Sequence, residues 1–140
     1  IKNAKYFAEC LKNAGLDVAG DPAISYTETH QVILRVGYGT GPDAANRLEN
    51  NNIIVNYQAT PEEEGFTASG ALRLGVAEMT RFGFGCKEFE QTAELIADVI
   101  LRDKNVKEDV RKFRSNFTEM KYCFTDEDIN KSLENLLNTL

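Results

Sequence analysis

Arg73 is the residue whose type and setting point most directly to chemistry. It stands in the middle of residues 69–75, a short run that reads Ser-Gly-Ala-Leu-Arg-Leu-Gly. Neighbouring side chains on a strand point to opposite faces, so Leu72 and Leu74 would face the core and Arg73 the other side. A half-buried guanidinium is costly unless an anion meets it, and its planar fork matches a carboxylate. Two readings follow: Arg73 holds the carboxylate of a ligand, or it pairs with an Asp or Glu of the protein or lies in solvent.

The other reactive side chains do not form a recognisable catalytic or metal-binding set. His30 is the one histidine of the sequence, which leaves almost no room for a Ser/His/Asp triad or a metal cluster. Cys10, Cys86 and Cys123 are odd in number and widely spaced, as is typical of reduced thiols rather than of disulfides or a zinc site. The acidic run at residues 62–64 is typical of a solvated turn. We therefore expect no metal site.

A glycine-rich segment, Gly-Tyr-Gly-Thr-Gly, occupies residues 37–41. Such a segment can cradle a phosphate or form a turn. It lacks the last glycine of the dinucleotide fingerprint and the Gly-Lys-Ser/Thr of a P-loop, so we expect a turn. Thr40 is expected to cap the helix that follows, with Asp43 in the capping-box position.

Length and composition exclude several classes of protein. The chain has 140 residues, which fits one domain with a real core, and 42% of them are hydrophobic and 27% charged. The net charge of −6 argues against nucleic acid or a membrane surface as a partner, because both attract basic patches. No apolar run approaches the roughly 20 residues that span a bilayer. We expect a cytoplasmic protein and, since the sequence opens on Ile1 rather than Met, a processed product or a piece of a longer chain.

Hydrophobic periodicity predicts the elements that would position Arg73. Apolar side chains at helical spacing predict helices at residues 2–14, 41–50, 86–103, 106–117 and 126–139, and one helical turn at 77–81. Apolar runs predict strands at residues 16–19, 31–36, 53–55 and 69–75. The stripe of the last helix is expected in the core, and its residues are Ile129, Leu133, Leu136, Leu137 and Leu140. This order indicates an α+β fold, in which a small mixed or antiparallel sheet carries helices on one face.

Several short motifs follow one another in a fixed order along the chain. Thr-His-Gln-Val-Ile-Leu begins at Thr29, and Thr-Gly at residues 40–41 opens a helix. The later motifs are Ile-Ile-Val-Asn-Tyr-Gln-Ala-Thr-Pro at 53–61, Ser-Gly-Ala-Leu-Arg-Leu-Gly at 69–75, Met-Thr-Arg-Phe-Gly at 79–83 and Ala-Asp-Val-Ile at 97–100. In this order and spacing, roughly residues 1–120 resemble the C-terminal (small) domain of serine hydroxymethyltransferase. That family consists of pyridoxal-phosphate enzymes with the aspartate-aminotransferase fold, also called fold type I.

The resemblance implies a role for Arg73. In that family the matching arginine binds the carboxylate of the amino-acid substrate, here glycine or serine. The Schiff-base lysine, the aromatic residue stacked on the cofactor and the aspartate on the ring nitrogen all lie in a large upstream domain of the family. The resemblance thus implies pyridoxal phosphate in the full-length protein, but no catalytic or cofactor-binding residue in this chain, which alone would be inactive. Family members are homodimers or tetramers, so the implied partners are the chain's own large domain and a second subunit.

The sequence also departs from the family pattern. Gly-Val-Ala-Glu at residues 75–78 replaces the family's Gly-Thr-Pro-Ala after the arginine. A family asparagine that helps to hold folate aligns with Gln58, which keeps the amide but adds a methylene. These departures weaken the expectation of tetrahydrofolate binding. Residues 125–140 extend beyond the usual end of the family, so we expect a small domain at residues 1–124 and a C-terminal helical extension at 125–140.

Two alternatives to a hydroxymethyltransferase remain open. In the first alternative, the chain is the small domain of another fold-type-I pyridoxal-phosphate enzyme, such as an aminotransferase or a decarboxylase. Such an enzyme would also use an arginine for the α-carboxylate. Otherwise it is a non-catalytic α+β interaction module, in which Arg73 pairs with a carboxylate of the protein itself.

Overall fold

The computed structural model describes residues 1–60, 68–121 and 125–138. In chain order the elements are α1 (Lys2–Asn13), β1 (Asp17–Val18), η1 (Pro22–Ile24), β2 (Gln31–Arg35), α2 (Gly41–Asn50), β3 (Asn56–Gln58), β4 (Ala71–Gly75), α3 (Ala77–Arg81), α4 (Cys86–Arg102), α5 (Lys107–Arg114) and α6 (Asp126–Leu137). The predicted α+β class is confirmed, with a four-stranded antiparallel sheet.

The sheet has the strand order β1-β2-β4-β3, so β4 lies between two partners. Antiparallel register fixes which side chains share a face, because directly opposed residues point to the same side. Leu72 of β4 lies opposite Leu34 of β2, and Leu74 lies opposite Val32. All four of these side chains are buried. They form the covered face of the sheet.

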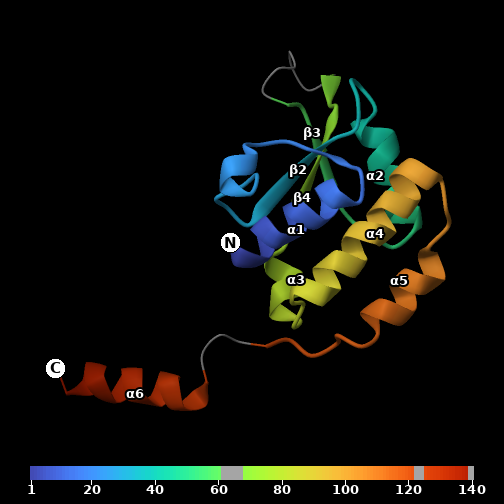
Figure 1. Cartoon of the computed structure of the whole chain (residues 1–140). Coiled ribbons are helices and arrows are strands. Elements are labelled where there is room, and N and C mark those ends of the chain that lie inside the picture. The colour runs from blue at the N-terminus through green and yellow to red at the C-terminus, as the bar shows by residue number, and fades with distance from the viewer. Residues whose placement is uncertain (61–67, 122–124, 139–140) are drawn as a thin grey trace.

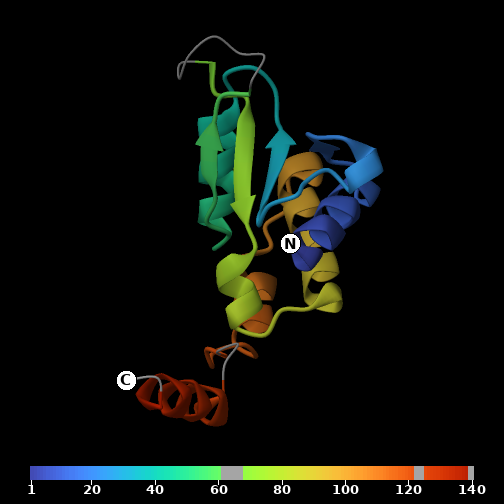
Figure 2. The ribbon, with the colours of Figure 1, turned by 90° about the vertical axis from the view of Figure 1, so that its left-hand side faces the viewer.

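Among the residues that the structure describes, helices cover this apolar face and not the opposite one. In Figure 2 the strands lie in front of α2, and α1 and α4 lie to the right of β2. Helices α1 and α4 pack against each other, and the rings of Phe7 and Phe89 meet with centroids 5.2 Å apart (Figure 1). Gly15 follows α1 with a φ of +96°, a backbone conformation that residues with a Cβ atom rarely adopt. The chain then enters β1. One face of the sheet is therefore core, and the other, on which no helix of the described residues packs, is called the open face below.

Polar contacts fasten α2 to the end of α4. The Arg47 guanidinium donates to the carbonyl of Val99 and to Asp103, with 2.9 Å between Arg47 Nη2 and Asp103 Oδ1. Asn51 at the end of α2 accepts a hydrogen bond from the backbone N–H of Val106, at 2.7 Å. Since α2 connects β2 to the segment before β3, these contacts help to hold the sheet edge in place.

One predicted strand is wrong in position. The run at residues 53–55 is not a strand, and β3 follows it at Asn56–Gln58. Ile53 instead donates its backbone N–H to the carbonyl of Leu48, which completes the turn out of α2. The side chain of Ile54 is 84% exposed. The apolar, β-branched residues at 53–55 predicted a strand, but β4 pairs with the polar segment Asn56–Gln58 that follows them.

Two helix predictions also need correction. Thr40 stands at the start of α2, but its hydroxyl donates to the carbonyls of Val36 and Gly37 and does not cap the helix. These bonds close the glycine-rich turn instead. In α6 the Thr125–Asp128 capping box forms, yet the apolar stripe is exposed rather than core. The described residues of that stripe are Ile129, Leu133, Leu136 and Leu137, and Leu140 lies outside the described residues.

No helix of the described ranges combines the length and the apolar character needed to cross a bilayer.

The alternation of faces in β2 predicts different costs for two neighbouring truncations. Leu34 is fully buried on the covered face, so Leu34→Ala should lower the free energy of unfolding by about 2–5 kcal/mol. Ile33 lies on the open face and is half-buried, so Ile33→Ala should cost about 1 kcal/mol. Urea unfolding followed by circular dichroism measures both, and equal losses would contradict the register.

Candidate functional site

Arg73 lies at the centre of the open face. In the register of the sheet it stands opposite Ile33 of β2 on one side and Asn56 of β3 on the other. Its neighbours along the strand, Leu72 and Leu74, are buried on the covered face, whereas Arg73 is half-buried. The sequence-based prediction of its orientation is therefore confirmed. The flanking strands fix the base of the side chain and leave its guanidinium toward the open side.

Within the ranges that the structure describes, no hydrogen bond or ion pair joins Arg73 to another residue. Other arginines do have acidic partners. Arg35, on the same face, lies 3.9 Å from Asp17, and Arg102 lies 2.5 Å from Asp98. The alternative in which Arg73 pairs with a carboxylate of this chain thus finds no support among the described residues. A guanidinium with five donors remains available to an anion.

The structure brings Gln58 to the same face as Arg73. Gln58 stands opposite Ala71 in the pairing of β3 with β4, two residues along from the pair of Asn56 with Arg73. Diagonal neighbours of this kind are roughly 7–8 Å apart at the backbone, which long side chains can span. Asn56 adds a second amide directly beside Arg73. Sequence reasoning assigned no role to Asn56, because it placed the strand at residues 53–55.

The sheet face around Arg73 carries side chains that can bind a ligand but, at its register positions, no nucleophile or general base of the usual kinds. Its register positions are Asp17, Gln31, Ile33, Arg35, Asn56, Gln58, Ala71, Arg73 and Gly75. These residues include no lysine, histidine, serine or cysteine. A Schiff base needs a lysine amine, so the strands of the described sheet do not by themselves fit pyridoxal phosphate. The face can recognise a carboxylate and amide-bonding groups, and the reacting groups would have to come from elsewhere.

The remaining candidates lie away from this face. His30 is an exposed residue before β2, and its carbonyl accepts the backbone N–H of Val76. Burial raises the pKa of the Cys10 thiol in α1, which keeps it protonated, and Cys86 is an exposed free thiol. Cys123 and residues 62–64 lie outside the described residues. The described residues contain no cluster of three or more His, Cys, Asp or Glu that could hold a metal ion.

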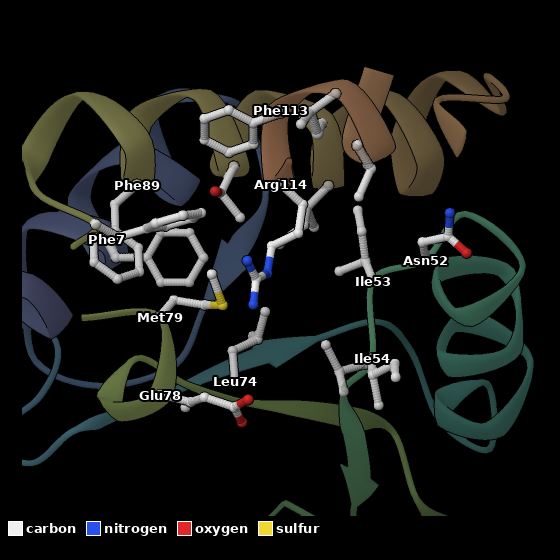
Figure 3. A pocket seen from close by; sticks show the side chains of 17 residues that line it. Phe7, Asn52, Ile53, Ile54, Leu74, Glu78, Met79, Phe89, Phe113 and Arg114 are labelled. Atoms are coloured by element: carbon white, nitrogen blue, oxygen red, sulfur yellow. The ribbon is translucent and has the colours of Figure 1, made fainter. Parts of the chain in front are cut away.

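A cavity of about 400 Å³ opens on the other side of β4 (Figure 3). Leu74 lines it together with Met79 of α3, Phe113 of α5 and the segment at residues 53–55. Arg73 does not line this cavity, because its side chain points to the opposite face. The cavity and the open face thus share only the backbone of Gly75 among the register positions named above, and Arg73 belongs to the open face alone.

A sequence model of serine hydroxymethyltransferase matches residues 1–96. The chain belongs to the serine hydroxymethyltransferase family. A serine hydroxymethyltransferase of Pyrobaculum aerophilum is 41% identical over an alignment of 127 residues, which covers 89% of this chain and 29% of that protein. The enzyme of Sulfolobus acidocaldarius is 37% identical over 146 aligned positions, covering 100% of this chain and 34% of the relative. The chain thus spans about a third of the length of these curated relatives.

A solved structure shares the fold. The L-threonine transaldolase of Pseudomonas fluorescens superposes with a TM-score of 0.77 at 29% sequence identity. The match covers 96% of this chain and 32% of that protein. The arrangement of the open sheet and its helices is therefore one that also occurs within a longer polypeptide.

Substitution of Arg73 tests whether this side chain contributes to the stability of the fold, since it has no partner among the described residues. Arg73→Met should change the free energy of unfolding by less than about 0.5 kcal/mol, because no bond to a described residue is lost. Arg47→Met is the matched control and should cost about 1–3 kcal/mol, since it removes the bonds to Val99 and Asp103. Urea unfolding measures both. A loss at Arg73 as large as at Arg47 would mean that Arg73 serves the fold.

Proposed function

We propose that this chain supplies the amino-acid-binding wall of a serine hydroxymethyltransferase-type enzyme, in which Arg73 clamps the carboxylate of glycine or serine. The supporting observation is the half-buried guanidinium at the centre of the open sheet face, without a described internal partner. The names of the family and of the solved neighbour both point to amino-acid substrates, serine and L-threonine. Every α-amino acid carries the carboxylate that a guanidinium fork fits.

The clamp would orient the substrate as well as bind it. A hydrogen bond to a charged group contributes about 1.5–3 kcal/mol, and two parallel bonds from one guanidinium also fix direction. Direction matters because a carboxylate held in one orientation would fix which bond of the α-carbon faces the reacting groups of the longer protein. Ile33 and Asn56 flank Arg73 across the strands and restrict how far the carboxylate can shift sideways.

Pyridoxal phosphate would belong to the longer protein and not to this chain. The cofactor, when bound, serves as the electron sink for the substrate's α-carbon. The proposed division of labour places the lysine and the cofactor in a large upstream domain, residues 1–124 in the small domain and residues 125–140 in a C-terminal extension. Gln58, on the face of Arg73, is the proposed folate-side contact. The proposed assembly is a homodimer of such longer chains.

The decisive test uses the longer protein that carries this chain behind its upstream domain. Arg73→Ala should lower kcat/KM for serine by about 100-fold or more, because the bidentate clamp is lost. Arg73→Lys should recover only part of this loss, since an ammonium keeps the charge but not the fork. Arg111→Ala on α5, an exposed arginine away from the sheet, is the control and should leave the kinetics unchanged.

Each outcome of that test has a defined meaning. Kinetics unchanged in Arg73→Ala would reject the clamp. Activity on amino acids that does not need tetrahydrofolate would favour another fold-type-I enzyme, while the role of Arg73 in holding the carboxylate would stand.

The chain alone should not retain pyridoxal phosphate. The open face carries no lysine at its register positions, so the expected result of incubation with the cofactor followed by equilibrium dialysis is complete release. Stoichiometric retention, with visible absorbance that survives dialysis, would overturn this expectation and place a cofactor site within these residues.

A further inference from the structure

The open face is not equally free on the two sides of Arg73. Ala71 lies two residues before Arg73 on β4 and Gly75 two residues after it, so all three positions share the open face. Ala71 is fully buried, whereas Gly75 is exposed. Among the described residues, a Cβ atom placed on Gly75 would meet no atom within 4 Å. A ligand held by the Arg73 guanidinium therefore finds room over Gly75 and not over Ala71.

The charges on the face favour the same side. Arg35 stands opposite Ala71, and its Nη1 lies 3.9 Å from Oδ1 of Asp17. A carboxylate ligand on that side would meet the negative charge of Asp17 and an arginine that already has an acidic partner. The residue opposite Gly75 is Gln31, which carries no charge. The side of Gly75 therefore opposes an anionic ligand less.

Gln31 is the polar side chain beside this space. It is half-buried on the open face, and its backbone N–H donates to the Thr29 hydroxyl at 3.1 Å. No hydrogen bond joins its side-chain amide to another described residue. Gln31 and Arg73 are diagonal neighbours across β2 and β4, and such neighbours are roughly 7–8 Å apart at the backbone, which long side chains can span. Because Gly75 has no side chain, the Gln31 amide can extend over it toward a ligand of Arg73.

A carboxylate at Arg73 would need a further donor. Its two oxygens can accept about four hydrogen bonds, and the fork of a guanidinium supplies two parallel ones. Arg73 is half-buried, so the sheet would keep water from part of the carboxylate, and an unmade hydrogen bond there is costly. The Nε2 group of Gln31 is a donor on the side where the ligand has room.

We propose that the amino acid held by Arg73 lies over Gly75, and that the side-chain amide of Gln31 donates a further hydrogen bond to its carboxylate. Gln31 can do so only if Arg73 is the first partner of the carboxylate, so this assignment rests on the proposed function. Gly75 has a steric role in the same site. The missing side chain leaves the place that the ligand occupies, a use of glycine that is common where a ligand approaches a strand closely.

The first experiment measures the serine kinetics of the longer protein with substitutions at Gln31. Gln31→Leu keeps the size of the side chain but removes the donor, so KM should rise about fivefold or more while kcat stays nearly unchanged. Gln31→Glu also adds a negative charge beside the carboxylate, so its KM should rise further. Gln91→Leu replaces an exposed glutamine on α4 and is the matched control, which should leave both constants unchanged.

Substitutions at Gly75 test where the ligand lies. Gly75→Ala should raise KM for serine and Gly75→Val should raise it more, because their methyl groups would occupy the space of the ligand. Gly75→Ala should not lower the urea midpoint of the 140-residue chain, since the added Cβ meets no described atom within 4 Å. A substitution that spares the fold and weakens substrate binding identifies a steric role in the site.

The Arg73→Ala variant, measured alongside, separates two kinds of failure. Unchanged kinetics in Arg73→Ala would reject the proposed function and the role of Gln31 with it. A strong loss in Arg73→Ala together with an unchanged KM in Gln31→Leu and Gln31→Glu would overturn the role of Gln31 and leave the clamp standing. An unchanged KM in Gly75→Val would overturn the placement of the ligand over Gly75, again without affecting the clamp.

Discussion

The antiparallel register of β4 between β2 and β3 is the constraint on which the rest of the structure depends. Side chains alternate along β4, so the same five residues present leucines to the helices and a guanidinium to the opposite side. A slip of one residue would exchange these faces and put Arg73 into the core. Burial of Leu72 and Leu74 therefore fixes the position of Arg73. The free energy gained by burying these leucines thus holds the Arg73 side chain on the opposite face.

Much of this could be predicted from the sequence, because it depends on local periodicity. The period-two pattern at residues 71–75 predicted the strand and the face of Arg73, and the stripe of Phe89, Ala93 and Ile96 predicted α4. The resemblance of ordered motifs predicted the family. These signals were reliable because local pattern and tertiary packing agree at these places.

The errors occurred where tertiary contacts decide the outcome. Residues 53–55 have the composition of a strand, but the backbone of Ile53 closes the turn after α2 and the pairing begins at Asn56. This shift hid Asn56, although its alternation with Gln58 was a usable signal. Thr40 has the right type for a cap, yet nearby carbonyls attract its hydroxyl. The stripe of α6 indicated an amphipathic helix correctly, but a sequence pattern cannot tell which body such a helix packs on.

The two sides of β4 differ in chemistry, and this difference has a consequence for assembly. Arg73 and the amides of Asn56 and Gln58 face one side, whereas Leu74 and the apolar cavity lie on the other. A carboxylate held by Arg73 would lie on the open face and not in the cavity, because Arg73 does not line the cavity. The two surfaces still share one strand. Any partner that fills the cavity packs against Leu74, and it thereby stabilises the register that holds Arg73 in place.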